Sequence, residues 1–266
     1  MTFKHAFFVL CLSALMVACA KVPITGRKQM NLLAESEMMA MSVSAYQEFL
    51  GENAPLREND QRVQMVRGIG DRLAKAANEY LSSVGASDRV AGFQWEFNVV
   101  EDPAVNAWCM PGGKVVVYTG ILPVTQDEAG LAVVMGHEIA HAIARHGNER
   151  MSQGMMVQMG GMALDVALSQ NPGLTNDLFL QSYGLGSQLG MLAFSRKHET
   201  EADKMGLVFM AMAGYDPRNA PRFWERMSAG GGGAPPELLS THPSDETRVR
   251  DLEHFMPEAL KYYKPQ

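Results

Sequence analysis

Residues 137–141 read His-Glu-Ile-Ala-His, and this pentapeptide says more about the fold and chemistry of the chain than any other stretch. Residues four apart in a helix lie on one face, one turn from each other. His137 and His141 can therefore direct two imidazole nitrogens at one Zn²⁺ ion, while Glu138 lies beside the vacant coordination position and accepts a proton from water. A pattern this short also arises by chance, so the site it predicts needs a helical setting and a third ligand.

The residues around the motif have the pattern of a buried helix. Asp127 and Glu128 precede an apolar run, and Arg145 and His146 follow it, as suits the two ends of a helix dipole. Gly147 is expected to end the helix. Two histidines and a glutamate in such a helix need partners, because unpaired buried polar groups are costly. The alternative to a metal site is a pair of core histidines that bond to backbone carbonyls.

A third ligand is expected on a second helix, where residues 195–206 read Ser-Arg-Lys-His-Glu-Thr-Glu-Ala-Asp-Lys-Met-Gly. Glu199 is expected to bind the metal, and Asp203, one turn on, to hydrogen-bond the far nitrogen of a ligand histidine and fix its tautomer. Glu201 is the competing ligand, but no acidic residue follows it four positions later. Gly206, on the face of Glu199, would let this helix approach the first one closely.

Further segments along the chain carry a family resemblance. They are residues 23–29, 106–107, 111–114, 117–120, 195–203, 214–217, 241–243 and 248. Together with the His-Glu-x-x-His motif, they resemble the HtpX-like and CAAX-prenyl-protease-like zinc metalloendopeptidases, and within these the bacterial lipoproteins related to mitochondrial OMA-type peptidases. The resemblance implies one Zn²⁺ per chain, bound by His137, His141 and Glu199, with Glu138 as the catalytic base. It also implies a mainly helical α+β domain of the zincin (gluzincin) type, with a small sheet beside the active-site helix.

The coarse pattern of the chain predicts two helices before the motif and a small sheet. Helices are expected at residues 31–50 and 58–84, and strands at residues 93–100 and 114–119 with a turn at residues 111–113 between them.

Residues 107–118 are expected to form an edge strand or rim that aligns an extended peptide beside the metal by strand addition. A plain hairpin in a small sheet is the alternative, and both can hold at once. The substrate-binding residues predicted in this region are Asn106, Ala107, Gly112 and Gly113.

The N-terminus has the pattern of an exported protein. Lys4 precedes an apolar run at residues 6–18, which is too short to span a bilayer and suits the core of a signal peptide. We therefore expect residues 1–18 to be a signal peptide.

Two cleavage sites are open at the end of this run. Residues 16–19, Met-Val-Ala-Cys, resemble a lipobox, in which Cys19 becomes the lipidated N-terminus and residues 19–30 a tether to the membrane. Ala20 after the cysteine resembles the outer-membrane sorting signal of Gram-negative bacteria, so the expected location is the periplasmic side of the outer membrane. Cleavage after Ala20 is the alternative, and it would release a soluble periplasmic protein.

Composition limits the domains and partners of the chain. A net charge of −6 and a pI of about 5.7 argue against nucleic-acid binding, and no basic cluster is present. Residues 31–266 are long enough for a single domain with a well-formed core. The sequence shows no internal repeat, so no C-terminal repeat domain is expected. With Cys19 lipidated, Cys109 would be alone in the mature chain, so no intramolecular disulfide is expected.

Two further segments of the sequence each allow more than one interpretation. The methionine- and glycine-rich residues 151–193 suit either a mobile lid or membrane-facing hairpin, or two core helices with close glycine contacts. His242 suits an oxyanion-stabilising role, an inhibitory role in the open metal position, or a place outside the site. Residues 230–233, all glycine, look like a hinge that would let the His242 loop move.

These observations predict a zinc-dependent endopeptidase that hydrolyses misfolded or misassembled cell-envelope proteins. One alternative is a periplasmic chaperone or assembly factor whose latent protease site is blocked by His242. Another is a protein with a purely structural metal, but Glu138 argues against it, because a structural site needs no base.

Overall fold

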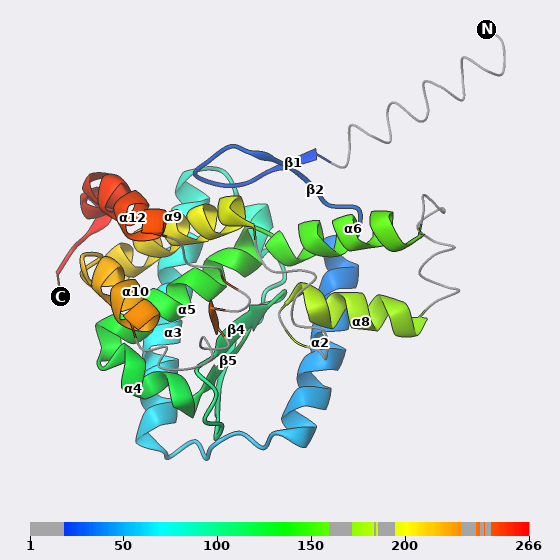
Figure 1. Cartoon of the computed structure of the whole chain (residues 1–266), viewed down its shortest axis with the longest axis horizontal. Coiled ribbons are helices and arrows are strands. Elements are labelled where there is room, and N and C mark those ends of the chain that lie inside the picture. Colours follow the sequence, from blue (N-terminus) through cyan, green and yellow to red (C-terminus); the bar gives the residue numbers. More distant parts are fainter. Residues whose placement is uncertain are drawn as a thin grey trace, which may run out of the picture.

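The computed structural model describes residues 19–159, 172–183, 185, 195–229, 238–239, 242 and 246–265. These residues form a mainly helical structure with a small sheet, which confirms the predicted fold class (Figure 1). The predicted signal peptide at residues 1–18 and the predicted hinge at residues 230–233 lie outside the described residues.

The elements follow one another along the chain with the hairpin first and the sheet between two groups of helices (Figure 1). They are β1 (Cys19–Lys21), β2 (Lys28–Met30), α2 (Glu35–Glu52), α3 (Gln61–Ser83), η1 (Ser87–Val90), β3 (Glu96–Val100), β4 (Ala107–Met110), β5 (Lys114–Tyr118), η2 (Thr119–Ile121), α4 (Leu122–Thr125), α5 (Glu128–Ile143), α6 (His146–Met159), α8 (Pro172–Ser182), α9 (Arg196–Met212), α10 (Asn219–Ala229), α12 (Glu246–Ala259) and η3 (Leu260–Tyr262).

The sheet has the strand order β3-β5-β4, with β4 antiparallel and β3 parallel to β5. The turn at residues 111–113 therefore joins β4 to β5. The expectation that it connects the strand at residues 93–100 to the strand at residues 114–119 is wrong, because β4 lies between them in sequence and β3 is parallel to β5. Gly112 and Gly113, both with a φ of +81°, make this tight turn in a conformation that other residues rarely adopt. Strand β4 shows no alternation because all four of its residues are buried, which hid it from a periodicity argument.

Strand β5 is central and separates two cores. Val115 and Val117 lie in a core with residues of α3, α5 and α9, whereas Val116 and Tyr118 lie in a second core with residues of α2, α6 and α8. Alternate residues of a strand point to opposite faces of the sheet, so a strand covered on both sides is apolar throughout. The unbroken β-branched run of this strand follows from that position.

Helices α5 and α9 lie side by side and pack closely (Figure 1). A Cβ on Gly206 would lie 3.1 Å from the carbonyl carbon of Gly136 and from the amide nitrogen of His137. The close approach expected at Gly206 is therefore present. Each helix also has a capped start, since Asp127 accepts a hydrogen bond from the Gly130 amide and Ser195 accepts one from the His198 amide.

Helix α5 ends at Ile143, earlier than the stop expected at Gly147. Arg145 adopts a left-handed conformation with a φ of 59°, which breaks the helix, and α6 begins at His146. Gly147 serves another purpose, because a Cβ there would lie 2.1 Å from the ring of Tyr183. The break brings His146 back beside His141, with 2.9 Å between their Nδ1 atoms.

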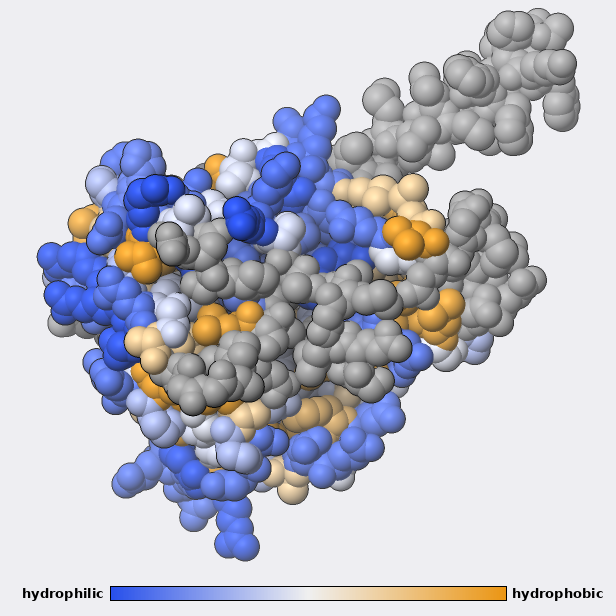
Figure 2. Space-filling view, viewed as in Figure 1, coloured by the Kyte–Doolittle hydropathy of each residue, from blue (hydrophilic) through white to orange (hydrophobic). Residues whose placement is uncertain are grey.

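Helices α6 and α8 form the described part of the methionine-rich segment. Met151 and Met155 are buried in the core beside α2 and the sheet, whereas Met156 is 55% exposed. None of the described helices is long and apolar enough to span a bilayer. On the face drawn in Figure 2, the described residues are mostly hydrophilic, with hydrophobic side chains in small separate groups.

Candidate active site

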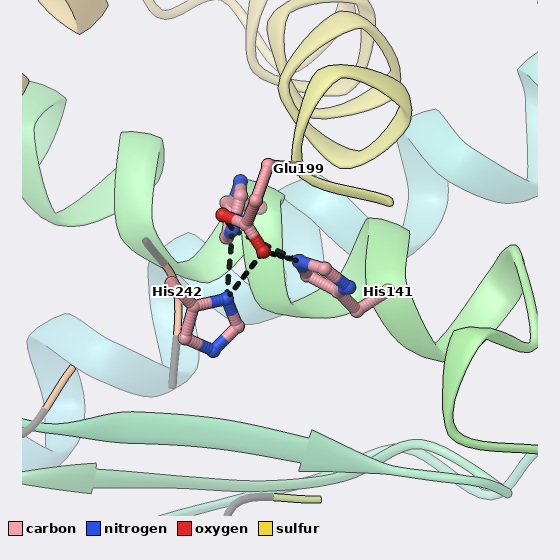
Figure 3. A group of neighbouring side chains, drawn as sticks. His141, Glu199 and His242 are labelled. Carbon is pink, nitrogen blue, oxygen red and sulfur yellow. Dashed lines mark hydrogen bonds and ion pairs between the residues drawn. The ribbon is translucent and has the colours of Figure 1, made fainter. Parts of the chain in front are cut away.

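Four buried side chains from three segments of the chain converge on one point (Figure 3). His137 and His141 come from α5, Glu199 from the first turn of α9, and His242 from the segment that precedes α12. One possible ligand atom from each residue lies within 4.8 Å of the others. Each side chain is at most 5% exposed.

The distances between these atoms suit a tetrahedral metal ion. Nε2 of His137 lies 3.0 Å from Nε2 of His141 and 3.3 Å from Nδ1 of His242, and the Glu199 carboxylate lies 3.1 to 3.4 Å from the three histidines. Ligand atoms bound to one zinc ion at 2.0–2.2 Å stand about 3.3–3.6 Å apart. The Glu199 Oε2 atom is buried 3.3 Å from Nε2 of His137 and 3.2 Å from Nη1 of Arg248, but it makes no hydrogen bond with either. The residues therefore fit a single divalent cation.

Asp203 lies where the pattern of α9 led us to expect it. Its Oδ1 atom is 2.9 Å from Nδ1 of His137, the ring nitrogen that points away from the converging atoms. When Nε2 of His137 binds a metal, a carboxylate at this point holds the remaining proton of the ring on Nδ1.

Arg248 of α12 holds both acidic residues and was not assigned a role from the sequence. Its guanidinium donates to the two oxygens of Asp203 over 2.7 and 2.9 Å, and its Nη1 lies 3.2 Å from Oε2 of Glu199. It also stacks over the ring of Trp224 in α10, 3.3 Å from the centroid. Arg248 thus fixes the orientation of Asp203 and Glu199 from behind.

The carboxylates set the charge of the site. Burial alone would lower the pKa of His137, but the carboxylates of Asp203 and Glu199 outweigh it and raise this pKa to about 9. Burial and the neighbouring His137 hold the pKa of His141 well below its ordinary value. Burial opposes ionisation of Glu199, yet His242 and His137 bring its pKa well below the usual range. Glu199 is therefore an anion, as a metal ligand must be.

Glu138 points into the same buried space. Its Oε1 lies 3.7 Å from Nε2 of His242 and has no hydrogen-bond partner. Burial raises its pKa above the ordinary value for a glutamate. A carboxyl group whose pKa moves toward neutrality is suited to accept and return a proton at neutral pH.

Glu201 belongs to a different group of residues. Its carboxylate lies 2.9 Å from Nε2 of His146 and contacts Arg27, on the side of α9 that faces β1, β2 and α6. Among the described residues, it is not part of the cluster that His137, His141, Glu199 and His242 form. The sequence did not reveal this second group, because its members are up to 176 residues apart.

The predicted substrate-binding residues lie at the two ends of β4. Ala107 begins the strand and Asn106 precedes it, next to Val105, whose carbonyl accepts a hydrogen bond from the Leu238 amide. Gly112 and Gly113 lie at the other end, against Met39 and Trp95. Within the part of the chain that the structure describes, this hydrogen bond connects the Asn106–Ala107 end to the segment that carries His242.

The chain is similar to known peptidases. The model of peptidase family M48 matches residues 70–256. The mitochondrial metalloendopeptidase OMA1 of Schizosaccharomyces pombe is 36% identical over 90% of this chain and 66% of its own length. The human metalloendopeptidase OMA1 is 33% identical over 90% of this chain and 46% of its own length. The beta-barrel assembly-enhancing protease of Escherichia coli is 28% identical over 86% of this chain and 46% of its own length. The chain thus spans between 46% and 66% of the length of these relatives.

These comparisons overturn the location that was inferred from the N-terminus. Relatives that are 33 to 41% identical, from human, S. pombe and Arabidopsis thaliana, are mitochondrial proteins, whereas the E. coli relative is 28% identical. The expectation of a periplasmic lipoprotein on a Gram-negative outer membrane, or of a soluble periplasmic protein, is therefore wrong. It rested on a four-residue pattern after a short apolar run, which is a weak signal.

The family match includes α5 and α9, the two helices that supply His137, His141 and Glu199. It confirms the resemblance that the motifs carried, and the named relatives agree with the expected class of enzyme, a metalloendopeptidase. On these grounds the chain belongs to peptidase family M48.

Proposed function

We propose that the chain is a zinc-dependent endopeptidase that cuts misfolded or misassembled proteins. The observation that carries the proposal is the buried convergence of His137, His141 and Glu199, with the carboxylate of Glu138 beside them. Two imidazoles and one carboxylate are the ligand set of catalytic zinc sites of the thermolysin type, which keep one coordination position for water.

The residues of the chain divide the chemistry among themselves. Zn²⁺ held by His137, His141 and Glu199 would lower the pKa of a water molecule and polarise the scissile carbonyl. Glu138 would accept the proton of that water on its carboxylate and then donate it to the departing amine nitrogen. Asp203 and Arg248 would keep the ligands oriented throughout.

Two observations support an unfolded protein as the substrate. Ala107 of β4 is buried but lies on an edge strand of the sheet, and an edge strand is where an extended peptide can add by backbone hydrogen bonds. Only an unfolded segment is free to lie extended along such an edge. The name of the E. coli relative, which couples a protease to the assembly of β-barrels, agrees with a task in quality control.

Proteolysis of an unfolded model protein tests this function. The purified chain should cut carboxymethylated α-lactalbumin at internal bonds, because this modified substrate is permanently unfolded and its backbone is accessible. A chelator should abolish cleavage and one equivalent of Zn²⁺ should restore it. Native, folded α-lactalbumin is the matched control and should remain intact. Cleavage that persists after complete removal of the metal would contradict the proposal.

A second candidate function is that of a chaperone or assembly factor with a latent protease site. His242 favours it, because its Nδ1 lies 3.3 Å from Nε2 of His137 and 3.1 Å from Oε1 of Glu199. That atom thus lies at the separation expected of a fourth ligand, where a catalytic water would bind. An enzyme in this state would bind a client without cutting it.

Replacing His242 with alanine distinguishes the two functions. We expect peptide cleavage to accelerate, because the fourth position becomes open to water. If the state with His242 on the metal is favoured by about 1.4 kcal/mol, about a tenth of the molecules have the fourth position open. Removal of His242 then raises the rate about tenfold. The measurement is the initial rate of cleavage of a fluorogenic peptide.

The sign of the change decides between the roles of His242. If it stabilises the oxyanion instead, the rate should fall about 10²–10³-fold. The double variant Glu138→Gln/His242→Ala is the control. It should be inactive, because any increase in cleavage rate still requires Glu138 to accept the proton of the attacking water. An unchanged rate would place His242 outside the reaction.

A further inference from the structure

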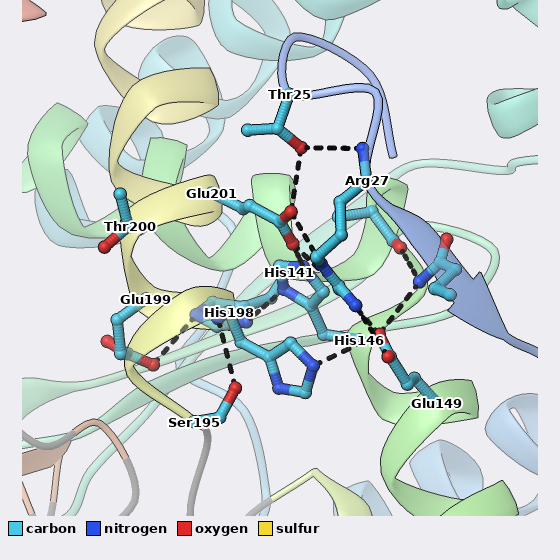
Figure 4. A network of polar contacts seen from close by, with 12 residues as sticks. Thr25, Arg27, His141, His146, Glu149, Ser195, His198, Glu199, Thr200 and Glu201 are labelled. Carbon is cyan, nitrogen blue, oxygen red and sulfur yellow. Dashed lines mark hydrogen bonds and ion pairs between the residues drawn. The ribbon is translucent and has the colours of Figure 1, made fainter. Parts of the chain in front are cut away.

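A second buried network starts at the metal-distal face of His141 (Figure 4). While Nε2 of His141 faces Glu199, its other ring nitrogen lies 2.9 Å from Nδ1 of His146. Nε2 of His146 in turn lies 2.9 Å from Oε2 of Glu201. Both histidines are at most 2% exposed.

The direction of these hydrogen bonds follows from the chemistry of imidazole. A histidine that binds a metal through Nε2 carries its proton on Nδ1 and donates it. Nδ1 of His146 must then accept, which leaves the proton of a neutral His146 on Nε2, where it is donated to Glu201. The orientation of His141 therefore depends on an anionic acceptor two hydrogen bonds away.

Arg27 holds that acceptor in place from the hairpin of β1 and β2. Its Nε and Nη2 donate to the two oxygens of Glu201 over 2.8 and 2.9 Å, and its Nη1 and Nη2 donate to Glu149 over 2.7 Å. The Thr25 hydroxyl adds a further hydrogen bond to Glu201 over 2.8 Å. The exposed fractions of the two glutamate side chains are only 4% and 7%.

Without Arg27 this arrangement would be unstable. Two buried carboxylates that share a site repel each other, and one of them would become protonated or turn toward water. A planar guanidinium compensates both through paired hydrogen bonds, which the single ammonium of a lysine does not reproduce. The hairpin presents Arg27 at this point because Gly26 turns the chain with a φ of +66° and Val22 anchors it at 1% exposure.

We propose that Arg27 is a positioning residue for the metal ligand His141, and that it acts through Glu201 and His146. The N-terminal hairpin thereby sets the metal affinity of a site to which it contributes no ligand. This inference rests on the proposed role of His141 in binding Zn²⁺.

The experiment measures the affinity of the full chain for Zn²⁺ by competition with a chromophoric chelator. Loss of a group that orients a ligand histidine costs about 10–100-fold in metal affinity, so Arg27→Met should weaken binding by about tenfold. Arg27→Lys should recover part of the loss. Lys28→Met removes the same charge from the exposed neighbouring position and should bind like the wild type. Thermal unfolding of the metal-free variants shows whether each one is folded.

A double-mutant cycle separates positioning from a general loss of stability. Glu201→Gln should weaken zinc binding by about 10–100-fold, and adding Arg27→Met to it should cost little more, because both changes break the same connection. Equal affinity of Arg27→Met and the wild type would overturn the inference, and so would fully additive losses. A wild-type chain that binds no Zn²⁺ would instead refute the proposed function itself.

Discussion

We expect Glu138→Gln to lower the turnover number on the order of 10²–10⁴-fold while the metal stays bound. The amide has nearly the shape of the carboxylate, but it cannot accept the proton of a water molecule. The three ligand side chains are unchanged, so Zn²⁺ should remain at one equivalent. The measurements are the turnover number on a fluorogenic peptide and the metal content of the same sample.

A change at the start of the same helix gives the control for this experiment. Glu128→Gln removes one carboxylate from α5 at a half-exposed position, where it pairs with Arg72, and should leave the turnover number near the wild-type value. Full activity of Glu138→Gln would show that another group is the base. Loss of metal from Glu138→Gln would show that this residue holds the site together.

The second large effect is expected at the third ligand. Glu199→Gln should weaken Zn²⁺ binding by more than about a thousandfold, because it removes both a coordinating anion and its charge from a buried site, whereas loss of an outer partner costs 10–100-fold. Asp203→Ala should fall within that smaller range, since it removes the partner of His137 Nδ1 and of Arg248 but no ligand of the metal. The measurement is again competition with a chelator.

Glu201→Gln is the matched comparison, because this residue lies on the same helix and is equally buried. It should cost no more than Asp203→Ala. If Glu201→Gln bound Zn²⁺ more weakly than Glu199→Gln, the metal would lie on the other side of α9, and the assignment of the cluster would be wrong.

Much of the candidate site was predictable because its signals are local. The four-residue spacing of His137 and His141 places them on one face of a helix, and the same spacing relates Glu199 to Asp203. The structure brings His137, His141 and Glu199 together. The small sheet was also expected, with residues 107–118 as its edge, but hydrophobic periodicity did not show β4 as a separate strand, because a short strand buried on both faces has no alternation.

The sequence by itself determined which residues are candidates for binding a metal and for acting as a base, since their types recur at helical spacing and so share a face. The tertiary structure alone decided how that chemistry is held. Arg27 lies 174 residues before Glu201, and Arg248 lies 45 residues after Asp203, so no periodic pattern links them. His146 also needed the structure, because the left-handed Arg145 breaks α5 and turns the following residue back to His141. Contacts of this kind depend on how separate elements pack against one another. Such packing produces no regular residue spacing in a single sequence, so the sequence alone does not predict them.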